Sequence, residues 1–151
     1  MKETMEQFLQ KVSKIEFTYI IREMLESFFT FTLDFKEEGI ASEVEIKSIE
    51  EISEKLNFTK EIESKIMEYL IKTNLKNWKK EYLAEESERE RKITFEWKLV
   101  VTFKDNSTKE CHGINNSPRK MIHMTMISMA IQTMAMKQAK KGIFAVTSDE
   151  A

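Results

Sequence analysis

The stretch ITFEWKLVVTFK, residues 93–104, decides the fold class because its apolar and polar side chains alternate with period two. Alternation of this kind is typical of a half-buried strand. Residues 105–107 supply a turn and residues 108–113 a return strand. A three-residue loop places Cys111 opposite Val101 on the apolar face, whereas a two-residue loop would bury two ionisable neighbours of Cys111 at a cost of several kcal/mol. The sequence therefore predicts an antiparallel hairpin with a three-residue loop.

A second hairpin is predicted upstream, where residues 29–35 and 40–46 also alternate. The turn over residues 36–39 ends at Gly39, which can adopt a positive φ without steric cost. Each hairpin has one apolar and one polar face. Two such hairpins indicate an antiparallel sheet with helices packed on one of its faces.

Four helices are expected around the hairpins. Apolar residues at three- and four-residue steps predict a helix over 4–26. Ser48 is expected to cap a short helix over 49–56, and Thr59 a longer one that ends near Leu83. The order is then α-β-β-α-α-β-β-α, which is an α+β fold.

The last predicted helix, residues 117–141, is long and rich in methionine. Asn116 or Ser117 is its expected cap, and Pro118 would stand at the first helical position. Gly142 is placed to end the helix. We therefore expect one domain over 1–142, followed by a loose C-terminal tail over 143–151.

Composition excludes several classes of protein. The chain has 151 residues, of which 41% are hydrophobic and 33% charged, with three Gly and one Pro. These proportions are wrong for collagen-like, low-complexity or disordered chains. Cys111 is the only cysteine, so no intrachain disulfide is possible. We find no signal-peptide pattern and no long apolar run, and we expect a cytoplasmic protein without membrane contact.

Charge is unevenly distributed along the chain. Residues 1–90 carry 14 basic and 21 acidic side chains, a net charge of −7, and residues 91–151 carry 10 basic and 5 acidic ones, a net charge of +5. The basic half could bind an anion. Alternatively, the two halves attract each other within one chain or between subunits, and we favour this interpretation.

The start of the last helix is the candidate anion site. Backbone N–H groups, the positive end of the helix dipole and two cations would converge there. The residues expected to contribute are Asn116, Ser117, Arg119, Lys120 and His123. The alternative is that the two cations are simply solvated or pair with acidic residues.

The methionine helix is apolar on nearly every side, although a helix on a sheet needs only one apolar stripe. Either it is covered by the rest of the chain, or one side meets a partner, for which adaptable methionine side chains are suitable. Core burial is the leading interpretation and a homodimer interface the next. The interface residues would be Met121, Met124, Met129 and Met136.

Other motifs are weak. Residues 49–72 have the spacing of a helix-turn-helix, but carboxylates on the second helix would repel phosphate, which argues against sequence-specific DNA binding. Cys111 and His112 point to opposite faces of a strand and cannot easily share a metal ion. The chain has neither of the glycine-rich phosphate-binding motifs. We expect no metal, no cofactor and no enzymatic activity.

The sequence therefore favours a non-catalytic binding protein that works as a homodimer and regulates or inhibits another macromolecule. Compact, charged chains without motifs are common among the inhibitors that bacteriophages and mobile elements use against host defences. The alternative function is binding of a small phosphorylated ligand or of nucleic acid through the basic C-terminal half.

Overall fold

A computed structural model describes residues 2–21, 27–37, 39–47, 51–83 and 95–150. Seven strands form one sheet in the order β4-β3-β2-β1-β6-β7-β5, and all neighbours are antiparallel except β5 and β7. The elements are α1 (Met5–Gln10), β1 (Val12–Ile21), β2 (Ser27–Lys36), β3 (Gly39–Lys47), β4 (Glu51–Asn57), α2 (Lys60–Thr73), η1 (Leu75–Asn77), β5 (Glu81–Leu83), β6 (Phe95–Phe103), β7 (Thr108–Ile114) and α4 (Met121–Glu150).

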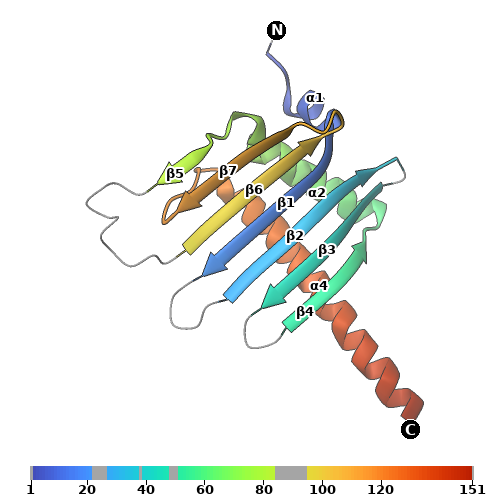
Figure 1. Cartoon of the computed structure of the whole chain (residues 1–151). Helices are drawn as coiled ribbons and strands as arrows, with labels where there is room; N and C mark the ends of the chain where they lie inside the picture. Colours follow the sequence, from blue (N-terminus) through green and yellow to red (C-terminus); the bar gives the residue numbers. More distant parts are fainter. Residues whose placement is uncertain (1, 22–26, 38, 48–50, 84–94, 151) are drawn as a thin grey trace.

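Helices α2 and α4 lie on one face of this sheet, as Figure 1 shows. The core fills the space between them and the inward side chains of the strands. No helix covers the opposite face among the residues that the structure describes. The α+β class and the long C-terminal helix are therefore confirmed, although strands occupy more of the chain than predicted.

The predicted hairpin between β6 and β7 is present, with a small shift. Phe103 donates to the carbonyl of Ser107 at 2.8 Å, and Asn106 has φ 70°, so the three loop residues are 104–106. Cys111 consequently faces Leu99, not Val101 as predicted. The shift preserves the facing of the strand, and Cys111 is fully buried.

The hairpin between β2 and β3 is also confirmed, and Gly39 has the expected positive φ, of 135°. Helix α2 holds this turn because the carboxylate of Glu63 accepts a hydrogen bond from the amide of Ile40 at 2.9 Å. A Cβ at residue 39 would overlap that carboxylate. Glycine is thus required here by its φ, whereas the Glu63 side chain could rotate away from a Cβ at the cost of its hydrogen bond to Ile40.

The predicted helix over residues 4–26 is wrong. Of the described residues in this range only 5–10 are helical, capped by Thr4, and the chain then forms β1. Residues 22–26 of the prediction lie outside the described residues. From Ile15 onward the buried positions alternate, and β1 pairs with β2 on one side and β6 on the other. Two ladders of hydrogen bonds outweigh the helical spacing seen in the isolated segment.

The predicted helix over residues 49–56 is also wrong, because residues 51–57 form the edge strand β4. Ile52 and Leu56 are four residues apart, a spacing that fits one face of either a helix or a strand. Residues 51–57 pair with the free edge of β3, and this pairing favours the strand over the helix. The predicted cap, Ser48, lies outside the described residues.

Helix α2 begins where predicted, with the Thr59 side chain accepting from the amide of Ile62 at 3.3 Å. It ends at Thr73, earlier than expected, because Asn74 adopts a left-handed conformation with φ 50°. A short turn then leads into β5, which pairs with β7.

Helix α4 begins at Met121, four residues later than predicted, and continues past Gly142 to Glu150. Asn116, Ser117 and Pro118 therefore do not cap or begin it. At the edge of the sheet the Gln138 amide donates to the carbonyl of Lys55 in β4 at 3.0 Å.

Candidate functional site

The segment between β7 and α4, residues 115–120, holds most of the predicted anion-binding residues. Three hydrogen bonds hold Asn116 in this segment. The side-chain oxygen accepts from the Ser117 amide at 2.9 Å, and the side-chain nitrogen donates to the Leu83 carbonyl at 3.1 Å. Its carbonyl accepts from Nε1 of Trp97 at 2.8 Å. Asn116 therefore ties this segment to the sheet.

Arg119 and Lys120 lie exposed just before the helix, and His123 lies in its first turn. The amides of Met121 and His123 donate to the carbonyls of Pro118 and Lys120, at 3.0 and 3.1 Å. Together with the Ser117 amide, three of the donors expected to receive an anion already have protein acceptors. The two cations remain together at the surface, beside these three engaged amides.

Cys111 and His112 point to opposite faces of β7, as the sequence predicts. Burial raises the pKa of the Cys111 thiol, while the nearby Lys109 lowers it by a smaller amount. His112 lies on the open face, with its Nε2 3.9 Å from a carboxylate oxygen of Glu81. Within the described part of the chain, no three His, Cys, Asp or Glu side chains come together as metal ligands.

The structure contradicts the helix-turn-helix interpretation of residues 49–72. Its first helix is the strand β4, which leaves α2 without the partner helix that such a motif requires. The first turn of α2 contains Glu61 and Glu63.

Helix α4 presents different side chains to the core and to solvent. The predicted interface residues Met121 and Met124 are buried against the sheet, together with Ile127 and Ile131. The other two predicted interface residues, Met129 and Met136, are exposed. Four large apolar side chains form the outer stripe of α4, with these exposed fractions: Ile122 63%, Met126 41%, Met129 58% and Met136 43%.

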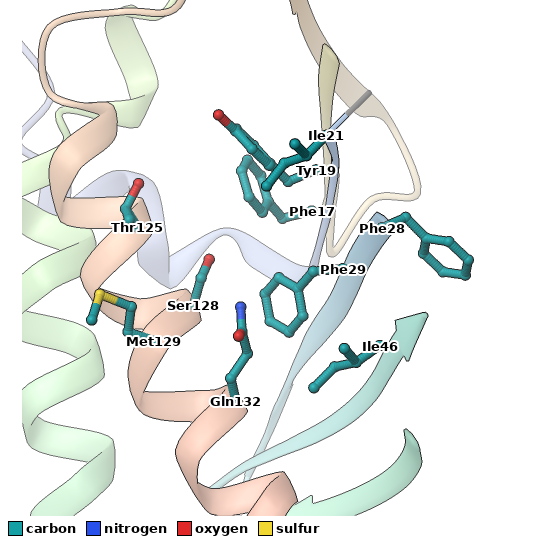
Figure 2. Close-up of a pocket in the computed structure, with 10 residues that line it drawn as sticks. All are labelled: Phe17, Tyr19, Ile21, Phe28, Phe29, Ile46, Thr125, Ser128, Met129 and Gln132. Atoms are coloured by element: carbon teal, nitrogen blue, oxygen red, sulfur yellow. The ribbon is translucent and has the colours of Figure 1, made fainter. Parts of the chain in front are cut away.

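A cavity of about 340 Å³ lies between α4 and the ends of β1, β2 and β3. Figure 2 shows its two walls, with strand residues on one side and helix residues on the other. The strands contribute Phe17, Tyr19, Ile21, Phe28, Phe29 and Ile46, and the helix contributes Thr125, Ser128, Met129 and Gln132. Its size falls in the range of small-molecule sites.

The strand wall of the cavity is aromatic. Phe17 stacks with Tyr19 at 6.4 Å between ring centroids, and the Tyr19 ring stacks in turn on Phe95 at 5.7 Å. Burial raises the pKa of the Tyr19 hydroxyl. Phe29 packs against Phe31 at 5.6 Å. The rings of this wall are therefore fixed by their neighbours and present rigid apolar surfaces.

Three of the four helix residues that line the cavity are polar. Thr125 and Ser128 donate to carbonyls one turn earlier on α4, at 3.2 and 3.0 Å, which leaves their oxygen atoms able to accept. The side chain of Gln132 points toward the strand wall (Figure 2). This wall has a signal in the sequence, namely three polar residues at steps of three and four within the methionine helix.

None of the described helices is long and apolar enough to cross a lipid bilayer. Comparisons of the chain with models of protein families, with curated proteins and with solved structures find no match.

Proposed function

We propose that this chain is a non-catalytic binding protein that acts as a homodimer and, in that form, regulates or inhibits another macromolecule. The observation that carries the proposal is the outer stripe of α4. It exposes four large apolar side chains on a helix that the rest of the chain covers only on its other sides. An apolar patch of this kind is typical of a protein contact surface.

The spacing of the stripe favours a helix as its partner. Ile122, Met126 and Met129 follow steps of four and three, and Met136 lies one heptad after Met129. This is the spacing by which one helix packs along another. The stripe is therefore shaped for a second helix with a similar apolar seam.

The charge of the stripe favours a second copy of this chain. Residues 121–136 contain no Asp, Glu, Lys or Arg, so this part of the helix offers no charged group for a complementary partner to recognise. A symmetric pairing of two α4 helices would match two uncharged apolar seams. Twofold symmetry would then bury each exposed side chain of the stripe in both copies of the chain.

The phosphorylated-ligand alternative has weaker support. Its cations, Arg119 and Lys120, are present at the surface, but three amides near them, those of Ser117, Met121 and His123, already donate to protein acceptors. The cavity under α4 has no cation among its described lining residues. We therefore place this alternative second.

The test is the molar mass of the intact protein by light scattering after size-exclusion chromatography, over a range of micromolar concentrations. We expect a dimer for the wild-type chain. The variant Met126→Glu should be monomeric, because twofold symmetry would place two unpaired carboxylates in the seam and weaken association at least about a hundredfold.

The matched control is Leu83→Glu, which places the same charge on an exposed apolar residue of β5. This variant should remain a dimer. Circular dichroism confirms that both variants are folded. A wild-type monomer at every concentration would overturn the homodimer, and a dimer that Met126→Glu leaves intact would overturn the assigned surface.

A further inference from the structure

We propose that the cavity between α4 and the ends of β1, β2 and β3 binds an uncharged, ring-containing small molecule that carries a hydroxyl or N–H group. The proposal does not depend on the homodimer, since the cavity lining shares only Met129 with the outer stripe of α4. The volume of about 340 Å³ suits a molecule of two or three rings.

The strand wall selects for a ring. Phe17, Tyr19 and Phe29 present aromatic surfaces whose positions are fixed by stacking on one another or on neighbouring rings. A planar apolar ligand could stack or pack edge-on against them and would remove apolar surface from water on both sides. Because these rings are already ordered, ligand binding would cost little side-chain entropy.

The helix wall selects for a hydrogen-bond donor. The hydroxyl protons of Thr125 and Ser128 are directed to carbonyls of their own helix, so their oxygens are left to accept. Gln132 adds an amide group that can both donate and accept. A hydroxyl or N–H group on the ligand, placed on the side opposite its ring, would meet these acceptors.

The described residues that line the cavity carry no charge, and this selects against an ionised ligand. Among the described lining residues, none is Asp, Glu, Lys, Arg or His. An ionised group in this space would lose its hydration without gaining a counter-charge, which costs several kcal/mol. This distinguishes the cavity from the phosphate site that the basic half of the sequence suggests.

The residues of α4 explain why the cavity stays open. Protein cores are normally filled, and this chain uses bulky Met and Ile at the inward positions of the same helix. Toward the aromatic wall it instead has a threonine, a buried serine and a glutamine. Three leucines at these positions would fill much of the space. The three polar side chains leave this space open and supply hydrogen-bonding groups beside it.

The first test uses N-phenylnaphthylamine, a neutral dye with three aromatic rings and one N–H group, whose fluorescence rises in apolar surroundings. The wild-type chain should bind it with one site per chain. Gln132→Phe should fill the cavity and weaken binding at least about tenfold. Ala130→Phe, which adds the same ring on an exposed, roughly opposite side of α4, should bind as the wild type does.

The second test is competition against the bound dye. Para-phenylphenol should displace it, and para-phenylbenzoate, which has the same rings with a carboxylate, should compete at least about tenfold less well. Met126→Glu should retain dye binding whether or not it dimerises, because Met126 does not line the cavity. Failure of the homodimer therefore leaves this test intact.

Three outcomes would overturn the proposal. The first is no dye binding by the folded wild-type chain, as expected for a cavity that holds only water. The second is undiminished binding by a folded Gln132→Phe variant, which would place the dye elsewhere. The third is equal competition by the carboxylate, which would contradict the uncharged class of ligand.

Discussion

Trp97 and Gly113 face each other across β6 and β7, and the indole of Trp97 occupies the space that a side chain at residue 113 would need. A Cβ there would overlap both Nε1 of the indole and the carbonyl oxygen of Asn116, which are joined by a hydrogen bond. Trp97 also packs edge-on against Trp78 at 5.7 Å. The absence of a side chain at Gly113 thus allows Trp97 to contact both Asn116, after β7, and Trp78, before β5.

We expect Gly113→Ala to lower the free energy of unfolding by about 2–3 kcal/mol, since the added methyl must displace the indole or the backbone. Urea unfolding followed by circular dichroism measures this. A double-mutant cycle with Trp97→Phe tests the cause: the loss due to Gly113→Ala should be smaller in the Trp97→Phe background, where the overlapping Nε1 is absent. Equal stability of Gly113→Ala and the wild type would show that no such overlap exists.

Ser42→Ala should leave the protein as stable or stabilise it by up to about 1 kcal/mol. The Ser42 hydroxyl is buried and has no hydrogen-bond partner among the described residues, so alanine removes an unsatisfied group. Thermal and urea unfolding measure the change. Thr73→Ala is the contrasting variant, because the Thr73 hydroxyl donates to the Leu70 carbonyl at 2.6 Å. A clear loss of stability in Ser42→Ala would indicate an unrecognised partner.

Cys111 should react with iodoacetamide only when the protein unfolds. Burial raises the pKa of its thiol above the ordinary value of 9.0, so the folded state disfavours the thiolate. The resulting stabilisation is complete below pH 9.0 and is lost as the pH rises through the higher folded value. Mass spectrometry of the native and urea-unfolded protein measures the alkylation. Rapid alkylation of the native chain would contradict the burial.

Tyr19 should ionise above pH 10.0, because burial raises the pKa of its hydroxyl. The difference between ultraviolet titrations of the wild type and Tyr19→Phe isolates this group. Since the folded pKa is raised, the associated stability is present below pH 10.0 and declines as the pH passes through the folded value. A difference curve centred at or below pH 10.0 would place the hydroxyl in water.

Sequence periodicity identified the elements whose pattern has only one interpretation. The alternation through Trp97, Leu99 and Val101 fits a strand and no helix, and Thr59 stands at the start of a clear helical stripe. Residues 12–21 are different, because Val12, Ile15 and Tyr19 fit helical steps while Ile15, Phe17 and Tyr19 fit a strand. Only pairing with β2 and β6, which are distant in the sequence, resolves them.

The same ambiguity hid the cavity. The polar residues Thr125, Ser128 and Gln132 are visible within the methionine helix, but the wall opposite them includes Phe17 and Tyr19. Since these two were predicted to be helical, nothing in the sequence placed them across from α4. Two of the four predicted interface methionines are buried and two are exposed, for a related reason. Composition alone cannot say which methionines of an apolar helix face the sheet.

The pairing of β1 with β6 has a consequence for the synthesis of this protein. As the chain leaves the ribosome, β1 emerges early and can pair with β2, but its other edge stays open until β6, residues 95–103, has been translated. Contacts so distant in the sequence form slowly. The nascent N-terminal sheet therefore carries an unpaired edge for most of its synthesis, which is the period when a chaperone would have most to protect.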